Sequence, residues 1–190
     1  MRFTKHRRPI FSSFLFKLAI VAAVLWLISI PVSALDFTDG AASGTVLTII
    51  AATSTQDLAF GSIFQGVPKL IGYNNDAASS IFTITGEASA GINLQLILPE
   101  YVSLSGGSDR MTIIFSSTDA AVDTTTATPS TVSASDGWIN QNPYNLPASA
   151  VIGSAGTTRI YLGGKIVPSI DQTPGAYSGD IVLSVSYNGT

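Results

Sequence analysis

The clearest periodicity in the chain lies in residues 179–188, which read GDIVLSVSYN. Apolar side chains take every second position there, with Ile181, Leu183, Val185 and Tyr187 on one face and Ser184, Ser186 and Asn188 on the other, and Val182 is the exception on the polar face. Side chains on a β-strand alternate between its two faces. The pattern therefore predicts a half-buried antiparallel strand.

Earlier segments carry similar runs of β-branched and aliphatic residues. We predict further strands at residues 45–52, 58–64, 80–87, 92–99, 110–117 and 157–167. Turn sequences such as SGGS at 105–108 and TPG at 173–175 separate such runs, and no segment after residue 34 keeps a helical period. The domain is therefore predicted to be all-β, with about seven or more strands in an antiparallel two-sheet sandwich, and a closed barrel is the alternative.

The N-terminal residues have the layout of a secretory signal. Basic residues gather within the first seventeen positions, an apolar block follows at 18–30, and small residues come next. We predict a cleavable signal helix over residues 1–34, cut between Ala34 and Leu35, then a tether over 35–44 and a single domain over 45–190. The alternative is an uncleaved anchor over 14–30. In both cases the domain is exported to the periplasm, the cell surface or the medium, and only this segment meets the membrane.

The charged residues and the missing side chains argue against several functions. Residues 35–190 contain 4 basic and 12 acidic residues, a net charge of −8, so no basic stripe is present for nucleic acid. His6 is the single histidine and cysteine is absent, which excludes Ser-His-Asp triads and thiol nucleophiles from the domain. We expect no catalytic residue, no metal site and no cofactor. Scattered carboxylates, for example Glu87 and Glu100, leave a hydrolase as an alternative.

Residues 116–147 differ in composition from the rest of the domain. Eleven of the twenty residues at 116–135 are Ser or Thr, and the sequence GWINQNPYNLP follows at 137–147. We interpret the whole segment as an exposed loop insertion. Two interpretations stay open: a solvated loop without a ligand, or a binding loop in which Trp138 and Tyr144 stack on a glycan among asparagine side chains.

Four stretches of the domain, taken together, resemble the motifs of one protein family. They are DLAFGSI at 57–63, FTITGE at 82–87, LQLILPEYVSL at 94–104, and YLGG at 161–164 with PGAYSGDI at 174–181, which runs on to Tyr187. Together they resemble the bacterial secreted family called domain of unknown function 4402, over residues 45–188. Two features depart from this pattern. Chaperone-usher pilins typically have a penultimate tyrosine and a glycine further upstream on the terminal strand, whereas here three residues follow Tyr187, and Gly175 and Gly179 only approximate the glycine. The Ser/Thr-rich segment at 116–135 also looks like an insertion.

The resemblance implies an immunoglobulin-like sandwich, similar to pilin-like subunits of the spore-coat-U and chaperone-usher type. It also implies a structural role in a filament, pilus or coat at the cell surface, and it supplies no catalytic residues. The implied partners are copies of this chain or related surface subunits, with a periplasmic chaperone and an usher. The alternative function is an extracellular module that binds a glycan or a surface through the 137–147 loop.

A strand-donation mechanism places the donor at the start of the domain. Val46, Leu47, Ile49 and Ile50 follow the tether and are apolar. An incomplete sandwich can accept such a segment from a neighbouring subunit. The segment is apolar on both faces, so an internal core strand of the same domain is the other interpretation.

Overall fold

The computed structural model describes residues 44, 46–125 and 127–189, and the predicted signal helix with its cut at Ala34 and Leu35 lies outside the described residues. The described chain is all-β, and every strand pairing is antiparallel, as predicted. Its strands are β1 (Ala51–Gln56), β2 (Lys69–Ile71), β3 (Ser80–Thr85), β4 (Ile92–Ile97), β5 (Tyr101–Leu104), β6 (Arg110–Ile114), β7 (Ala120–Asp123), β8 (Gly137–Gln141), β9 (Thr157–Leu162), β10 (Gly164–Val167), β11 (Tyr177–Ser178) and β12 (Val182–Tyr187). None of the described ranges contains a helix long and apolar enough to span a membrane.

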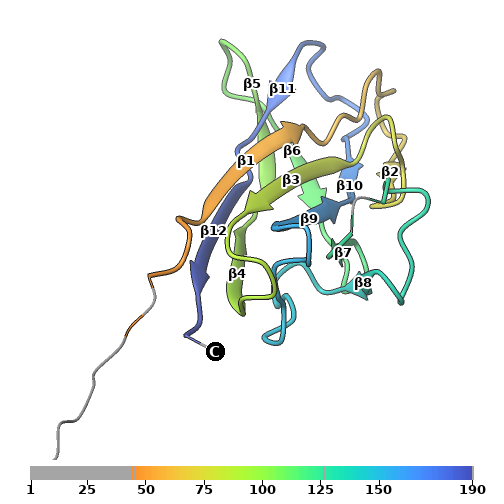
Figure 1. Cartoon of the computed structure of the whole chain (residues 1–190). Helices are drawn as coiled ribbons and strands as arrows, with labels where there is room; N and C mark the ends of the chain where they lie inside the picture. The colour runs from red at the N-terminus through yellow and green to blue at the C-terminus, as the bar shows by residue number, and fades with distance from the viewer. Residues whose placement is uncertain (1–43, 45, 126, 190) are drawn as a thin grey trace, which may run out of the picture. The chain divides into compact units, whose positions relative to one another are not determined.

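The strands form two layers (Figure 1). The first sheet has the order β1-β3-β9-β7-β8, and the second has the order β11-β5-β6-β10-β2. A two-stranded ladder of β12 and β4 extends the second sheet, because β4 runs on into β5 and β11 runs on into β12. The arrangement is that of a β-sandwich.

The core lies between these layers. One buried cluster contains Ile84 of β3 and Ile160 of β9 from the first sheet together with Ile92 of β4, and none of the three has exposed surface. On β12, Leu183 and Val185 are half-buried against this cluster, and the alternate residues Val182, Ser184 and Ser186 are exposed. The predicted alternation of the last strand is therefore confirmed.

The segment at 157–167, predicted as one strand, is two strands in two different sheets. β9 belongs to the first sheet and β10 to the second, and Gly163 lies between them. A Cβ atom added at Gly163 would lie 2.4 Å from the carbonyl oxygen of Ile71 and 2.6 Å from the amide nitrogen of Tyr73. The chain crosses between the sheets here because this residue has no side chain.

The interpretation of residues 116–147 as one loop insertion is wrong at two strands. β7 is buried at all four positions and pairs with both β8 and β9 inside the first sheet. β8, which includes Trp138, forms the edge of that sheet. A strand buried on both faces shows no alternation, and the Ser/Thr-rich residues around β7 hid its short run of Ala, Ala and Val.

The prediction of a strand at 58–64 is also wrong. Gly61 has a φ of 60°, which is left-handed and interrupts an extended run. Leu58 and Phe60 still pack against the core cluster, so their apolar character reflects packing without strand pairing. The first strand begins later than the predicted 45–52, at Ala51, and the short strands β2, β5 and β11 were not predicted.

Tyr161 of β9 brings a polar group into the core, and its replacement by Phe is a test of that group. Its hydroxyl lies 3.2 Å from Oδ2 of Asp123 and within hydrogen-bond distance of the Ala127 carbonyl, and both Tyr161 and Asp123 are fully buried. Tyr161→Phe should lower the free energy of unfolding at pH 7 by about 1 to 3 kcal/mol, because these acceptors lose a donor. Urea denaturation measures the difference.

The same variant should alter the dependence of stability on pH. Burial first, and the charge of Asp123 second, raise the pKa of Tyr161 to about 12. A raised pKa means that folding favours the neutral hydroxyl. The contribution of this group to folding stability is therefore complete below its pKa in the unfolded state, about 10, and is lost as the pH rises above that value. The unsubstituted protein should therefore lose more stability above pH 10 than Tyr161→Phe does, and parallel losses would contradict this assignment.

Candidate functional site

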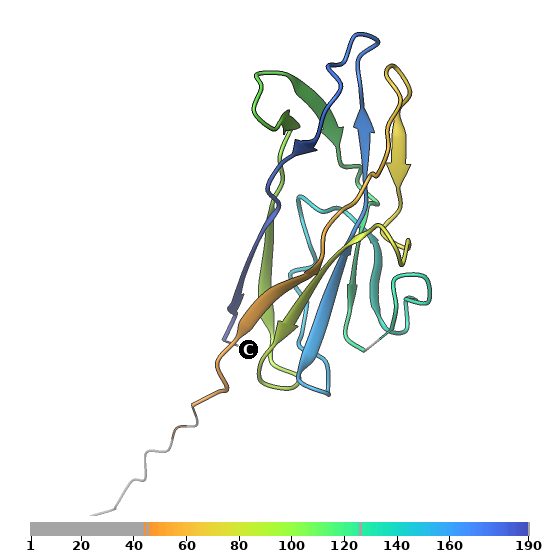
Figure 2. The same ribbon diagram turned by 90° about the horizontal axis from the view of Figure 1, so that it is seen from above.

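Two unpaired strand edges lie on one side of the sandwich. In the described part of the chain, β1 pairs only with β3, β12 only with β4, and β11 only with β5. β1 and β12 run side by side in both views (Figures 1 and 2). The N–H and C=O groups along an unpaired edge can pair with a strand from another chain.

The inner faces of these edge strands are incompletely covered. Ala52 and Ser54 of β1 stand directly opposite Ile84 and Phe82 of β3, and paired residues share one face of a sheet. Ile84 and Phe82 are buried, whereas Ala52 and Ser54 are exposed. The inward residues of β12 are only half-buried. The interior of the sandwich is therefore open along this side.

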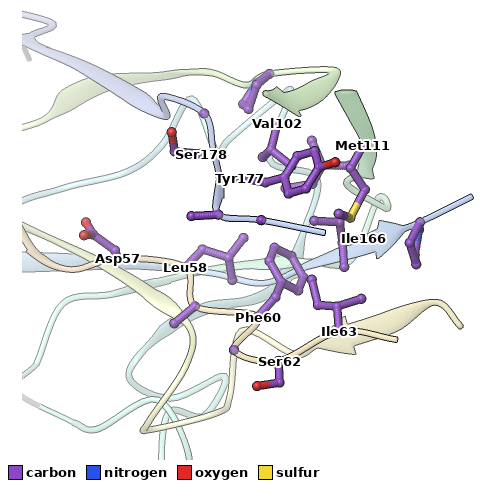
Figure 3. A pocket seen from close by; sticks show the side chains of 18 of the residues that line it. Asp57, Leu58, Phe60, Ser62, Ile63, Val102, Met111, Ile166, Tyr177 and Ser178 are labelled. Carbon is purple, nitrogen blue, oxygen red and sulfur yellow. The ribbon is translucent and has the colours of Figure 1, made fainter. Parts of the chain in front are cut away.

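A groove of about 1100 Å³ opens between the two edges, with residues 57–65 as one wall and residues 172–181 as the other. Its floor is apolar and consists of Phe82, Val102, Met111, Ile113 and Ile166. Figure 3 shows Phe60 and Ile63 of the first wall lying across from Tyr177 and Met111. A groove with an apolar floor beside an unpaired edge suits an extended segment that carries apolar side chains at alternate positions.

Asp109 holds the second wall of this groove. Its Oδ2 accepts hydrogen bonds from the Thr173 amide, from Nε2 of Gln172 and from the Tyr177 hydroxyl, each at 2.8 Å. The hydrogen bonds from Thr173 first, and then that from the Tyr177 hydroxyl, hold the pKa of Asp109 below its ordinary value. No group of three or more His, Cys, Asp or Glu in the described ranges could hold a metal ion. Asp109 therefore serves to fix the 172–177 wall to the turn before β6.

Asp109→Asn is expected to loosen this wall. The uncharged amide is a weaker acceptor for three donors than the carboxylate. Hydrogen exchange of the Thr173 amide should be faster in the variant at pH 7. Because the pKa of Asp109 is lowered in the folded state, its contribution to folding stability is complete above its pKa in the unfolded state, about 3.9. That contribution is lost as the pH falls below this value.

Asp171→Asn is the matched control for this experiment. Asp171 lies in the same connection between β10 and β11 and accepts a hydrogen bond from the Ser169 hydroxyl at 2.6 Å. The control should leave the exchange of the Thr173 amide unchanged. If both variants accelerate that exchange equally, the Asp109 bonds do not hold the wall.

The predicted donor residues come directly before β1 and are largely uncovered by the described domain. The exposed fractions are 97% for Val46, 87% for Ile49 and 45% for Leu47, and Ile50 packs partly against the core cluster. Thr48, between them, is anchored. Its carbonyl accepts a hydrogen bond from the Tyr187 hydroxyl at 2.7 Å, and its own hydroxyl donates to Glu87 at 2.7 Å. On the side of the sandwich where the groove opens, one end is therefore closed by the contact between Thr48, just before β1, and Tyr187 at the end of β12.

The two aromatic residues of the predicted ligand loop have different surroundings. Trp138 lies on β8 and packs partly buried against the core cluster. Tyr144 is 62% exposed and has the ring of Phe115 edge-on at 6.4 Å. Tyr144 lines a small hollow to which Trp138 does not contribute. The structure therefore does not bring the predicted aromatic pair into one site.

Sequence reasoning missed the groove floor and Asp109. Met111 falls in a predicted strand, but its alternation with exposed neighbours does not distinguish a groove floor from a closed core. Asp109 directly follows the turn sequence SGGS, which indicates a turn and nothing about its partners. Its three donors come from residues more than sixty positions later, so only the folded chain reveals them.

A scan against protein-family models finds no match, and a search of curated proteins finds no match. The resemblance to the secreted family stays a prediction that depends on its four motifs.

Proposed function

We propose that this protein is an exported, non-enzymatic structural subunit of a cell-surface filament, pilus or coat, and that copies assemble by adding a strand along β11 and β12. The observation that carries this proposal is the groove with an apolar floor beside an unpaired edge. The proposed occupant is the segment 46–50 of a second copy. That segment is apolar and exposed in its own domain.

The strand order supports an immunoglobulin-like arrangement with one position vacant. Constant-type immunoglobulin sandwiches have one sheet in the order A-B-E-D and another in the order C-F-G. The order β1-β3-β9-β7 corresponds to A-B-E-D, and β4–β5 beside β11–β12 corresponds to C-F. Strand G belongs on the free edge of β11–β12, where the described chain has no strand. A donated strand supplies that position.

Donation exchanges one set of contacts for another. The segment must leave the hydrogen bonds that Thr48 makes with Glu87 and Tyr187. In return, five residues in the extended conformation span about 17 Å and gain a row of backbone hydrogen bonds on the free edge. Their apolar side chains also leave water for the groove floor, which favours association by about 25 cal/mol for each Å² buried. The segment therefore gains more hydrogen bonds and more apolar burial in the vacant position of a partner domain than it has in its own domain.

Ile49→Asp tests the proposed donor. A carboxylate cannot pack against the apolar floor of the groove without losing its hydration. Protein recovered from cells that express the full chain should form multimers, and the Ile49→Asp protein should be monomeric, as light scattering after gel filtration measures. Ile170→Asp is the control, because Ile170 is 86% exposed, close to the 87% of Ile49, and lies in the loop after β10.

Two results would overturn the proposal. One is an unsubstituted protein that stays monomeric at all concentrations. The other is an Ile49→Asp protein that assembles as well as the Ile170→Asp control. Loss of assembly in both variants would also count against a specific role for residues 46–50.

A further inference from the structure

A second hollow lies on the outer face of the β4–β12 ladder. It has a volume of about 350 Å³, with residues 143–146 along one side and residues of β4 and β12 beneath. Pockets for small ligands occupy about 300 to 1000 Å³, so this hollow is at the lower end of that range. We call it the polar hollow.

Two directly paired rows of side chains form the floor of the polar hollow. Asn93 stands opposite Ser186 and Gln95 stands opposite Ser184, and all four are exposed. Amides and hydroxyls each offer both donors and acceptors of hydrogen bonds. No residue that lines the hollow carries a charge. The floor therefore suits a ligand with many neutral polar groups.

Tyr144 stands at the rim on a firmly held turn. Its chain neighbour Pro143 is fully buried, and Leu146 is 7% exposed. The Tyr144 amide donates to Oδ1 of Asn142 at 3.0 Å. Phe115 packs edge-on against the Tyr144 ring, with an interplanar angle of 84°. An aromatic ring fixed in this way offers its free surface to a ligand at a small cost in conformational entropy.

We propose that the polar hollow binds a neutral oligosaccharide. A pyranose ring has a face of C–H groups that stacks on an aromatic ring, and its hydroxyls both donate and accept hydrogen bonds, as the Asn, Gln and Ser side chains do. A charged ligand finds no opposite charge in the lining. An extended peptide pairs with a sheet edge, whereas this surface is the face of a ladder.

Binding in the polar hollow is independent of strand addition. Ser184 and Ser186 lie on the outer face of β12, whereas Leu183 and Val185 lie on the inner face toward the core cluster. A strand added to the edge of β12 leaves its outer face free. The proposal therefore holds for a monomer as well as for an assembled subunit.

The test measures binding of linear hexasaccharides of glucose, mannose and N-acetylglucosamine to protein recovered from cells that express the full chain. Isothermal titration calorimetry should detect at least one of them. Tyr144→Ala should weaken that binding at least about tenfold, and Gln95→Ala should weaken it severalfold, because a stacking surface and a hydrogen-bonding group are lost. Tyr101→Ala is the control, since Tyr101 is 41% exposed on β5 and does not line the hollow.

Three results would overturn the proposal. The first is that none of the three hexasaccharides binds at about 1 mM. The second is that Tyr101→Ala weakens binding as much as Tyr144→Ala does. The third is that binding survives both Tyr144→Ala and Gln95→Ala. Gln95 is exposed on a strand surface, so its variant decides the question if Tyr144→Ala does not fold. Light scattering on the same samples shows that a change in binding does not come from a change in assembly.

Discussion

Replacing Gly163 by Ala should lower the free energy of unfolding by about 3 to 5 kcal/mol, near the upper end of single-substitution effects. The added Cβ atom would lie 2.4 Å from the Ile71 carbonyl oxygen and 2.6 Å from the Tyr73 amide nitrogen. Both are backbone atoms in or next to β2, so no side-chain rotation relieves the overlap. The crossing between β9 and β10 has to move away from β2. Thermal denaturation should show a melting temperature lower by about 10 °C or more.

Gly106→Ala separates this overlap from the general cost of removing a glycine. Gly106 has a φ of 74° and no atom within 4 Å of an added Cβ. Its substitution carries only the penalty of a left-handed conformation, about 1 to 2 kcal/mol. Equal destabilisation by the two variants would show that the contact with β2 is not the reason for Gly163.

Mixing two variants that are each monomeric should restore assembly to dimers. Ile49→Asp removes the proposed donor and keeps the groove. Ser54→Trp fills the groove and keeps the donor, because Ser54 is exposed, faces inward on β1 and lines the groove. In the mixture, the intact donor of the Ser54→Trp chain enters the free groove of the Ile49→Asp chain. Gel filtration of the two proteins alone and together measures this effect.

The stoichiometry of the mixture makes this prediction specific. A chain with a blocked groove accepts no further copy, and a chain without a donor enters no further groove, so growth stops at two subunits. Thr53→Trp is the matched control, since Thr53 pairs with Thr83 on the opposite face of β1 and does not line the groove. If Thr53→Trp is monomeric too, or if the mixture stays monomeric, assembly does not use this groove.

Strand β12 shows what the sequence could predict. Its alternation comes from one face on the core and one face in water, and a single face can be identified without knowing the partners. The same holds for β3 and β4, which lie within predicted segments. These strands set the fold class, so the all-β antiparallel prediction was correct.

The wrong predictions share a physical cause. β7 is buried on both faces and therefore lacks a period, and the break at Gly163 depends on how closely β2 approaches from elsewhere in the chain. Residues 58–64 are apolar because they pack as a groove wall without pairing. In each case the deciding contact joins residues distant in sequence. The groove could not be predicted for the same reason, since it is the space between two segments more than a hundred residues apart.

The bond between Tyr187 and Thr48 places the start of β1 and the end of β12 at the same end of the domain. A mechanical load that enters through residues 46–50 pulls β1 along its own axis, because these residues run directly into Ala51 at the start of the strand. The ladder from Ala51 opposite Thr85 to Ser54 opposite Phe82 resists this pull in shear. Its hydrogen bonds bear the force together and do not open one after another. A domain loaded in this way yields at a higher force than one peeled from its edge.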